Sequence, residues 1–345
     1  MVLAIEWLDE AKPMIRLINQ TLLPGTEQYL DVTTVDVLVE SIRDLVIRGA
    51  PALGAAGALG VALAMVQADD EQWDVARLES EIDRIRDARP TAVNLAWGVD
   101  QVRGSVPSGI ATVLRLARQV VVDDEAANRR LSEHGADWIL AHVDKEKVRV
   151  VTHCNSGALA TSAWGTAYGV IHELHQRGRL GLVYADETRP LLQGARLTSW
   201  ELLHDGIEHV VQADSAAAST ILRGLVDVAI IGADRIAANG DTANKVGSVS
   251  LALACQRAGI PFVVAAPSST VDLTIKGGED IVIEERDEDE VLSLAGVRTA
   301  PSGARGFNPA FDVTPHDLIS VVVTERGFAE TATDARPDLL ATIAG

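Results

Sequence analysis

Cysteine is scarce in this sequence. The 345 residues include two cysteines, Cys154 and Cys255, which cannot build a framework of disulfide bonds. Because disulfides belong to oxidising compartments, this scarcity favours a reducing compartment, and we expect a cytoplasmic protein. Residues 1–10 have neither the basic region nor the long apolar stretch of a signal peptide, which agrees with that expectation.

Long apolar runs and positive charge are also lacking. No stretch reaches the roughly 18 uninterrupted apolar residues of a transmembrane helix. The most apolar candidate, residues 52–66, is full of Gly and Ala and is too short. The net charge is −19, with 30 Lys and Arg against 49 Asp and Glu. Nucleic acids and anionic membranes bind basic surfaces, so we expect neither as a partner.

Several common site motifs are missing as well. The sequence has no G-x-S-x-G turn, which argues against a Ser-His-Asp hydrolase. Its eight histidines are scattered without a matching set of Cys or carboxylate ligands, so we expect no metal. Gly54, Gly57 and Gly60 do not have the spacing of a dinucleotide-binding loop, and no strand precedes them. They predict close helix packing; alternatively, that helix presents its N-terminal amides to an anion, with Arg48 adding charge.

The spacing of apolar residues divides the chain into two parts. Helical spacing over 33–46, 52–66, 75–88 and 108–143 predicts a mostly helical N-terminal domain with short strands, over residues 1–143. Beyond it, short apolar runs at 148–151, 181–184, 209–212, 228–231 and 262–265 alternate with helical segments at 158–177, 191–204, 215–223 and 245–258. This alternation predicts an α/β fold, with a Rossmann-like, doubly wound parallel sheet over residues 144–345.

Polar turns follow these predicted strands at the sheet edge where α/β proteins bind ligands. Cys154 comes directly after the run 148–151 among polar neighbours, whereas Cys255 lies in an apolar segment and is assigned to the core. His153 could act as a base for Cys154. Adjacent residues of a strand point to opposite faces, however, so His153 could equally be a packed, internally hydrogen-bonded residue. Asp234 follows the run 228–231, and partial burial there raises a carboxyl pKa so that it can act as an acid.

Two further segments fall at the same predicted edge. The charged stretch 186–196 is either an ion-paired loop or part of the site. Asn244 and Lys245 are predicted to open the helix over 245–258. A lysine at a helix N-terminus opposes the helix dipole unless an anion binds there, which favours a phosphate site.

Six motifs together resemble the S-methyl-5-thioribose-1-phosphate isomerase family of methionine salvage. They are R-G-A-P-A at 48–52, R-P-T-A-V-N-L at 89–95, T-H-C-N-S-G-A-L-A-T at 152–161, D-E-T-R-P with Q-G-A-R-L-T at 186–198, G-A-D-R-I-A-A-N-G-D with A-N-K at 232–245, and N-P-A-F-D-V-T-P at 308–315. The resemblance extends to about Gly327. Its superfamily includes ribose-1,5-bisphosphate isomerases and regulatory subunits of a translation-factor exchange factor.

The resemblance implies an aldose-to-ketose isomerisation of 5-methylthioribose 1-phosphate to 5-methylthioribulose 1-phosphate, without cofactor or metal. We expect the enzyme to be a homodimer that associates through the second domain. It assigns the proton donor to Asp234 and transition-state support to Cys154. It assigns substrate binding to Arg48, Gly49, Ala50, Arg89, Gln193, Asn244 and Lys245. The alternatives are a related 1-phosphopentose, such as 5-deoxyribose 1-phosphate or ribose 1,5-bisphosphate, or a non-catalytic regulatory subunit.

The sequence departs from the family pattern in two places. Residues 213–218 read A-D-S-A-A-A where the family commonly has an acidic residue, Asn and Met, and 162–164 read S-A-W where small residues and Tyr are usual. These differences bear on the pocket around the 5-substituent of the sugar, so methylthio, deoxy and hydroxymethyl groups all stay open as substituents.

Overall fold

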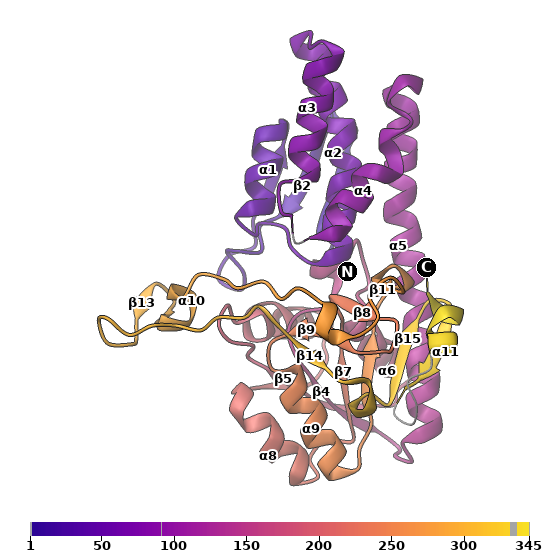
Figure 1. Cartoon of the computed structure of the whole chain (residues 1–345), viewed down its shortest axis with the longest axis vertical. Coiled ribbons are helices and arrows are strands. Elements are labelled where there is room, and N and C mark those ends of the chain that lie inside the picture. The colour runs from indigo at the N-terminus through magenta and orange to yellow at the C-terminus, as the bar shows by residue number, and fades with distance from the viewer. Residues whose placement is uncertain (1, 91, 332–336, 345) are drawn as a thin grey trace. The chain divides into compact units, whose positions relative to one another are not determined.

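The computed structural model describes residues 2–90, 92–331 and 337–344. They form two compact units, a mostly helical one and one built on a large sheet (Figure 1). The N-terminal unit comprises Met1–Ala126 and Gly157–Gly165, and the C-terminal unit comprises Ala127–Ser156 and Thr166–Gly345. The predicted α/β fold, with helices first and a parallel sheet second, is confirmed.

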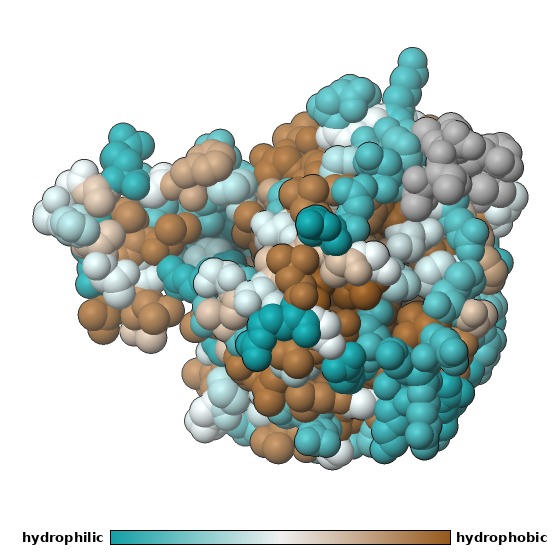
Figure 2. All heavy atoms as spheres, turned by 90° about the horizontal axis from the view of Figure 1, so that it is seen from below, coloured by the Kyte–Doolittle hydropathy of each residue, from teal (hydrophilic) through white to brown (hydrophobic). Residues whose placement is uncertain are grey.

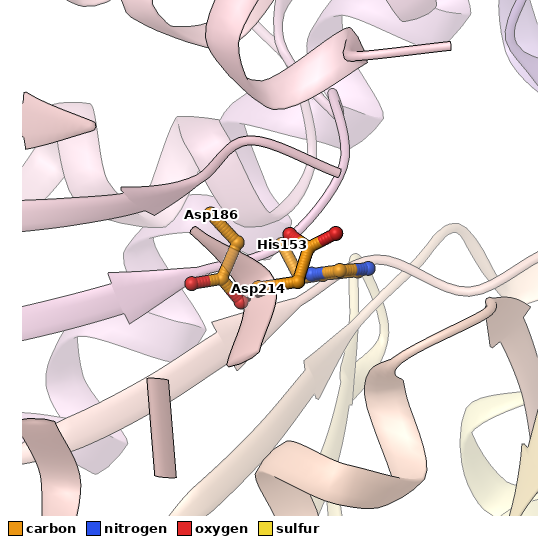
Figure 3. Close-up of side chains that lie close together, drawn as sticks. All are labelled: His153, Asp186 and Asp214. Carbon is orange, nitrogen blue, oxygen red and sulfur yellow. Dashed lines mark hydrogen bonds and ion pairs between the residues drawn. The ribbon is translucent and has the colours of Figure 1, made fainter. Parts of the chain in front are cut away.

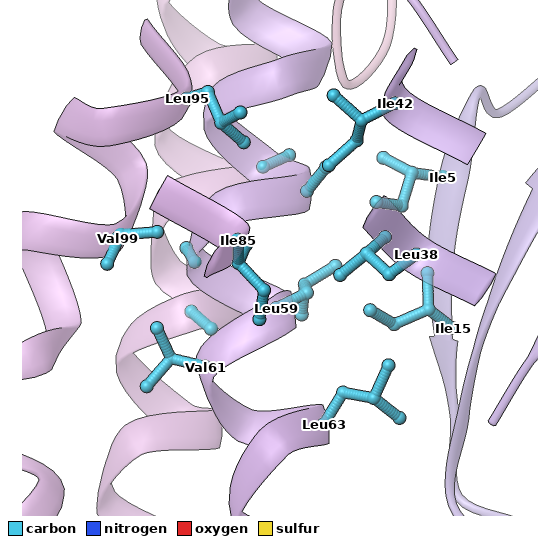
Figure 4. Packing of buried hydrophobic residues seen from close by; sticks show 14 of the residues in the cluster. Ile5, Ile15, Leu38, Ile42, Leu59, Val61, Leu63, Ile85, Leu95 and Val99 are labelled. Carbon is cyan, nitrogen blue, oxygen red and sulfur yellow. The ribbon is translucent and has the colours of Figure 1, made fainter. Parts of the chain in front are cut away.

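The N-terminal unit packs helices against a small antiparallel sheet. The sheet has the order β1 (Ile5–Leu8), β2 (Met14–Ile18), β3 (Tyr29–Val32). The helices are α1 (Val35–Arg43), α2 (Ala50–Glu71), α3 (Val75–Arg86), α4 (Val93–Arg103) and the first part of α5 (Ile110–His142). The Thr34 hydroxyl caps α1 by accepting from the Val37 amide, and aliphatic side chains fill the space between helices and sheet (Figure 4).

The core of this unit forms around α2. A Cβ on Gly57 would lie 2.4 Å from the Leu95 carbonyl oxygen of α4, and one on Gly60 would lie 2.7 Å from the Leu38 side chain. The close packing predicted from the glycine spacing is therefore confirmed. The helix is longer than predicted, because Pro51 is accommodated in its first turn and the helical structure continues to Glu71. Its length and composition would suffice for a membrane span, but 72% of its most apolar window is buried, as in a core helix.

The C-terminal unit contains a seven-stranded sheet with the order β16-β15-β10-β7-β4-β5-β6. Its strands are β4 (Val148–Thr152), β5 (Leu180–Asp186), β6 (His209–Gln212), β7 (Val228–Ile231), β10 (Phe262–Ala265), β15 (Val321–Thr324) and β16 (Gly327–Glu330). All pairs are parallel except β15 with β16. The helices of this unit include α6 (Ala167–Gln176), α7 (Ser199–His204), α8 (Ala217–Leu222), α9 (Ser248–Ala258) and α11 (Pro337–Ile343).

A second sheet, which the apolar pattern does not indicate, lies in the same unit. It has the order β11 (Val271–Asp272), β8 (Arg235–Ala237), β9 (Thr242–Lys245), β14 (Phe311–Thr314). Strand β9 changes one prediction: Asn244 and Lys245 end a strand and do not open a helix. Pairing of Lys245 with Phe311 extends β9 to this point, and α9 begins only at Ser248.

The helix predicted over 158–177 is also corrected. Residues Ala158–Ala160 form a single short 3-10 turn, η2, and α6 begins at Ala167. Trp164 and Gly165 both have positive φ angles, of 74° and 90°, which an α-helix cannot contain. The chain therefore leaves β4 through an irregular segment before α6.

The charge run 284–290 leads into an arm of the C-terminal unit. The arm carries α10 (Asp289–Leu292) and the two-stranded hairpin of β12 (Ser293–Leu294) and β13 (Val297–Arg298), and it extends away from the large sheet (Figure 1). Arg286 forms ion pairs with Glu284 and Glu290, so the run is internally paired. Hydrophobic side chains reach the surface along the arm and on the neighbouring face (Figure 2).

Candidate active site

Cys154 lies in the turn that follows β4, with a backbone φ of 65°. For an L-residue other than glycine, this left-handed conformation costs about 1–2 kcal/mol. Its backbone is fixed at both ends, because its amide donates to Thr188 Oγ1 (2.9 Å) and its carbonyl oxygen accepts from Thr198 Oγ1 (2.6 Å). The side chain is partly exposed and the sulfur is a free thiol. The predicted position of Cys154 after a buried strand is confirmed.

His153, its neighbour, is buried and points into the protein. Its Nδ1 lies 3.0 Å from Asp186 Oδ2 and its Nε2 lies 2.8 Å from the Val246 carbonyl oxygen. A carbonyl accepts only, so Nε2 carries a proton. Burial, the largest single effect, lowers the pKa of His153, but the hydrogen bond to Asp186 and the negative charges of Asp186 and Asp214 together outweigh it, and the pKa is raised. Burial raises the pKa of Asp186, so this pair retains a proton.

Asp214 lies beside this pair, and the three side chains form a cluster of possible metal ligands (Figure 3). Their polar atoms are already used. Asp214 accepts from the amides of Thr188 and Arg189, both at 2.7 Å, and Asp186 Oδ1 accepts from Gln212. A metal would need an unprotonated imidazole nitrogen, whereas both nitrogens of His153 are hydrogen-bonded. The cluster fits a structural network better than a metal centre.

A second buried carboxylate holds the other neighbour of Cys154. Asn155 Nδ2 donates to Glu201 Oε2 of α7 at 2.6 Å and to Thr198 Oγ1 at 3.3 Å. Asn155 and Glu201 are each 4% exposed. The residues on both sides of Cys154 are therefore fixed by buried acidic side chains from different elements.

Asp234 follows β7, the strand next to β4 in the sheet. Thr152 pairs with Ile230, so the segments after these two residues leave the sheet side by side. A Cβ on Gly232 would lie 3.4 Å from Ser156 Cβ, which places the two segments in contact. The Asp234 amide donates to the Ala243 carbonyl oxygen at 2.9 Å, and the residue is exposed. The partial burial predicted for it is therefore wrong, because the bend after β7 projects it from the sheet edge.

Gln193 lies immediately before a π-helical turn, η3 (Gly194–Thr198), and is 8% exposed. Within the described residues, its Oε1 atom is buried and accepts no hydrogen bond. An unsatisfied buried acceptor typically costs about 1–3 kcal/mol. This atom is thus a destabilising feature of a residue that the sequence assigns to substrate binding.

Lys245 and Asn244 lie at the end of β9. Lys245 Nζ donates to the Ala310 carbonyl oxygen at 2.7 Å and lies 4.5 Å from the centre of the Phe311 ring. Asn244 Nδ2 lies 3.0 Å from Ser248 Oγ. The helix N-terminus expected to bind phosphate already holds a carboxylate, because Asp312 accepts from the Gly247 amide at 2.7 Å. The amide end of α9 is therefore capped from β14.

Arg48, Gly49, Ala50 and Arg89 belong to the N-terminal unit. Gly49 is the N-cap of α2, with a φ of 96°, and among the residues that the structure describes no side chain hydrogen-bonds to cap this helix. A Cβ on Gly49 would lie 2.2 Å from the Ala160 carbonyl oxygen, so only glycine fits. Arg48 and Arg89 are half-buried, before α2 and after α3 respectively. Thr91 of the second motif lies outside the described residues.

Sequence reasoning missed the side chains that support this site. Thr188, Thr198, Asp214 and Asp312 hydrogen-bond to backbone groups of the site, and Glu201 hydrogen-bonds to the Asn155 side chain, yet none was assigned a role. Thr188 and Thr198 lie inside recognised motifs, which was an available signal. Asp312 also lies inside a recognised motif, at 308–315, whereas no local pattern exists for Glu201, which acts on a segment distant in sequence.

These features define an α/β protein with a candidate active site at the carboxyl edge of a parallel sheet. The chain belongs to the Initiation factor 2 subunit family, whose model matches residues 46–331. It is 47% identical to a methylthioribose-1-phosphate isomerase of Gloeobacter violaceus, over 90% of this chain and 89% of that protein. It is 48% identical to a probable bifunctional methylthioribose-1-phosphate isomerase/methylthioribulose-1-phosphate dehydratase of Nocardia farcinica, over 97% of this chain but only 60% of the relative's length.

Two crystal structures are similar to the whole chain. One is 5-methylthioribose 1-phosphate isomerase from Pyrococcus horikoshii, with a TM-score of 0.90, 36% identity, and coverage of 99% of this chain and 96% of that one. The other is the delta subunit of translation initiation factor eIF-2B from A. fulgidus, with a TM-score of 0.86, 36% identity, and coverage of 99% and 100%.

Proposed function

We propose that this chain is an aldose–ketose isomerase that converts 5-methylthioribose 1-phosphate to 5-methylthioribulose 1-phosphate, a reaction of methionine salvage. The observation that carries the proposal is the pair of segments after β4 and β7. They bring a partly exposed free thiol, Cys154, and an exposed carboxyl, Asp234, to one edge of the sheet. The relatives named as this isomerase support the same assignment.

The chemistry explains why these two residue types are needed. A sugar phosphorylated on its anomeric oxygen cannot open spontaneously, so an acid must protonate the ring oxygen, and we assign this step to Asp234. Hydrogen then moves from C2 to C1, either through an enediol-like intermediate or by a direct hydride shift. Cys154 supports this transfer on either route, as a thiolate or as part of an apolar wall.

Substrate recognition is assigned to the residues that the family resemblance gives. We propose that Gln193 accepts a hydrogen bond from a sugar hydroxyl, which would satisfy its buried Oε1 atom. Asn244 and Lys245 of β9 and Arg48, Gly49, Ala50 and Arg89 of the N-terminal unit complete the proposed set. The phosphate is assigned to the arginine and lysine cations of this set and to helix amides other than those of α9, where Asp312 accepts from the Gly247 amide.

The proposal is tested by assaying the purified protein on the 1-phosphates of 5-methylthioribose, 5-deoxyribose and ribose, side by side. We expect turnover of the methylthio sugar with the highest kcat/KM. Preference for the deoxy sugar would move the assignment to that substrate. Turnover of none would favour a regulatory subunit, since the family includes a translation-factor subunit of similar structure. Ribose 1,5-bisphosphate needs a second anion site, for which we found no additional basic cluster in the sequence.

We further propose that the enzyme is a cytoplasmic homodimer that associates through its C-terminal unit. Strand β6 is an edge of the large sheet, and its Val210 and Val211 are exposed. Leu203 of α7 and Leu222 of α8 are exposed by 74% and 57%. Apolar edge strands and contiguous apolar surfaces are usually covered by a partner. Sedimentation of wild type and Val211→Lys tests this: we expect a dimer and a monomer, respectively.

A further inference from the structure

The strained turn at Cys154 is surrounded by buried polar side chains. Thr188, Thr198, His153 and Asn155 are at most 4% exposed, whereas Cys154 itself is partly exposed. Burying polar groups is unfavourable unless each is hydrogen-bonded. Several buried polar groups therefore form hydrogen bonds around the backbone of one residue, Cys154, whose thiol is accessible.

The Thr188 hydroxyl is fully committed in this arrangement. Its single proton is donated to the Asp186 carbonyl oxygen at 3.1 Å, which leaves a lone pair to accept from the Cys154 amide at 2.9 Å. Thr188 itself has a φ of 65°, and Asp214 holds it in place through its amide. The end of β5 is thus shaped to bind the turn after β4.

The Thr198 hydroxyl acts on the other side of the same residue. It donates to the Cys154 carbonyl oxygen at 2.6 Å and lies 3.3 Å from Asn155 Nδ2. Its helical segment, η3, begins directly after Gln193, which we assign to substrate binding. The two threonines thus fix the amide and the carbonyl of one residue whose left-handed conformation its surroundings must impose.

We propose that Thr188 and Thr198 are positioning residues: their hydroxyls hold the backbone of Cys154 so that its thiol faces the substrate. This inference rests on the proposed isomerase function. Neither threonine takes part in hydrogen transfer. Because misplacement of a reacting group by about 1 Å costs on the order of 100-fold in rate, the effect of releasing the turn falls on kcat.

The test replaces each threonine by valine, which keeps the shape and β-branching and removes the hydroxyl, and by serine, which keeps the hydroxyl. We expect Thr188→Val and Thr198→Val to lower kcat by about 10- to 100-fold with KM changed by less than about twofold. The serine variants should recover most of the loss. Thr324→Val is the matched control, because Thr324 lies on β15 and the variant removes a buried hydroxyl that donates to the Ile343 carbonyl oxygen of α11.

A second readout does not need isomerase activity. Alkylation of Cys154 by iodoacetamide reports how the thiol is held, because Cys255 is fully buried and does not compete. We expect both valine variants to be alkylated several-fold faster than wild type, since the turn relaxes, and the serine variants to react at the wild-type rate.

The outcomes separate the two proposals. If the wild type is active and the valine variants keep its kcat, or if Thr324→Val loses as much, the positioning role is wrong and the isomerase function stands. If the wild type turns over no sugar phosphate, the proposed function is wrong. In that case, valine variants that are alkylated at the wild-type rate would also show that the threonines do not position Cys154, whereas faster alkylation would support that role.

Discussion

The imidazole Nε2 of His153 lies 2.8 Å from the carbonyl oxygen of Val246. This bond joins the turn after β4 to the connection between β9 and α9, two segments far apart in sequence. A Cβ on Gly247 would lie 2.8 Å from the same imidazole, so the connection packs directly on it. The residue before the candidate catalytic thiol is thereby fixed next to Lys245, a candidate substrate-binding residue.

The His153–Asp186 pair should make stability depend on pH. The pKa of His153 is raised in the folded protein, so its contribution is fully present below its unfolded pKa of about 6.5 and is lost as pH rises through the folded value. Asp186 also has a raised pKa, and Asp214 and Asp312 lie nearby as acidic groups. We expect the free energy of unfolding to fall as pH rises above about 6.5.

Asp186→Asn tests this, because an amide can pair with a neutral imidazole. In this variant the buried His153 stays neutral, whereas the histidine of the unfolded chain is protonated below about pH 6.5. The free energy of unfolding of the variant therefore increases with pH up to about 6.5. The difference in unfolding free energy between wild type and variant, measured by urea denaturation, should therefore narrow from about pH 5.5 to about pH 8.5. A difference that is constant over this range would show that the pair does not retain a proton.

Cys154→Ser and Asp234→Asn should each reduce kcat by about 10²–10⁴-fold while leaving the unfolding transition intact. Each removes one reacting group and changes little volume. The control is Cys255→Ala, since burial raises the pKa of that thiol to about 12 and it belongs to the core. Near wild-type turnover in both site variants would contradict the assigned chemistry.

Gln193→Met should separate stability from binding. Methionine fills a similar volume without a buried, unsatisfied oxygen, so we expect the free energy of unfolding to rise by about 1 kcal/mol. KM should rise about tenfold, because a substrate hydroxyl loses its acceptor. Denaturation and steady-state kinetics measure the two effects. If KM stays at the wild-type value, Gln193 is not a substrate ligand.

Lys245→Ala should chiefly weaken substrate binding. Nζ lies 2.7 Å from the Ala310 carbonyl oxygen and carries the positive charge with which a phosphate would pair. We expect KM to increase at least about tenfold, which corresponds to the loss of a charge-assisted hydrogen bond. Lys147→Ala is the control: Lys147 is exposed and precedes β4, at the opposite edge of the sheet. Equal KM values in the two variants would remove Lys245 from the phosphate site.

Gly49→Ala should lower the free energy of unfolding by about 1–3 kcal/mol more than Gly178→Ala, each measured for the transition of the unit that contains it. Both glycines have positive φ angles, of 96° and 66°, so alanine strains the backbone at each. Only at Gly49 does the new Cβ meet the Ala160 carbonyl oxygen, whereas nothing lies within 4 Å at Gly178. Urea denaturation gives the comparison, and equal losses would mean that the contact with Ala160 adapts without cost.

Local signals predicted most of the fold. The helix over 33–46, the strand over 148–151 and the parallel sheet were recoverable because apolar periodicity reports which face of each element is buried. The start of α6 was not, because the small residues 158–165 suit a helix locally and tertiary packing decides otherwise. The strand β9 was missed for a related reason: Thr242–Lys245 becomes a strand by pairing with β14, about 70 residues later in the chain.

The sequence predicted which residues belong to the site better than it predicted the burial and contacts of those residues. Cys154 was found because a cysteine among polar neighbours after a buried strand is unusual. The desolvation of Asp234 and the uncapped helix end at Lys245 were inferred from neighbours in sequence, and neither is found in the structure. Both depend on where the bend after β7 and the Asp312 side chain lie in space, which no local pattern specifies.

The segment Gly157–Gly165 belongs to the N-terminal unit although the chain on either side of it belongs to the C-terminal unit. It supplies the Leu159 carbonyl oxygen that accepts from Gln20 Nε2 at 2.7 Å, and it packs on Gly49 through Ala160. A gene cut at any single point would therefore not separate the two units, because residues 157–165 of the N-terminal unit are encoded after the first strand of the large sheet. A chimera that takes one unit from a relative therefore needs three junctions: one in α5 and two shortly after Cys154, on either side of residues 157–165.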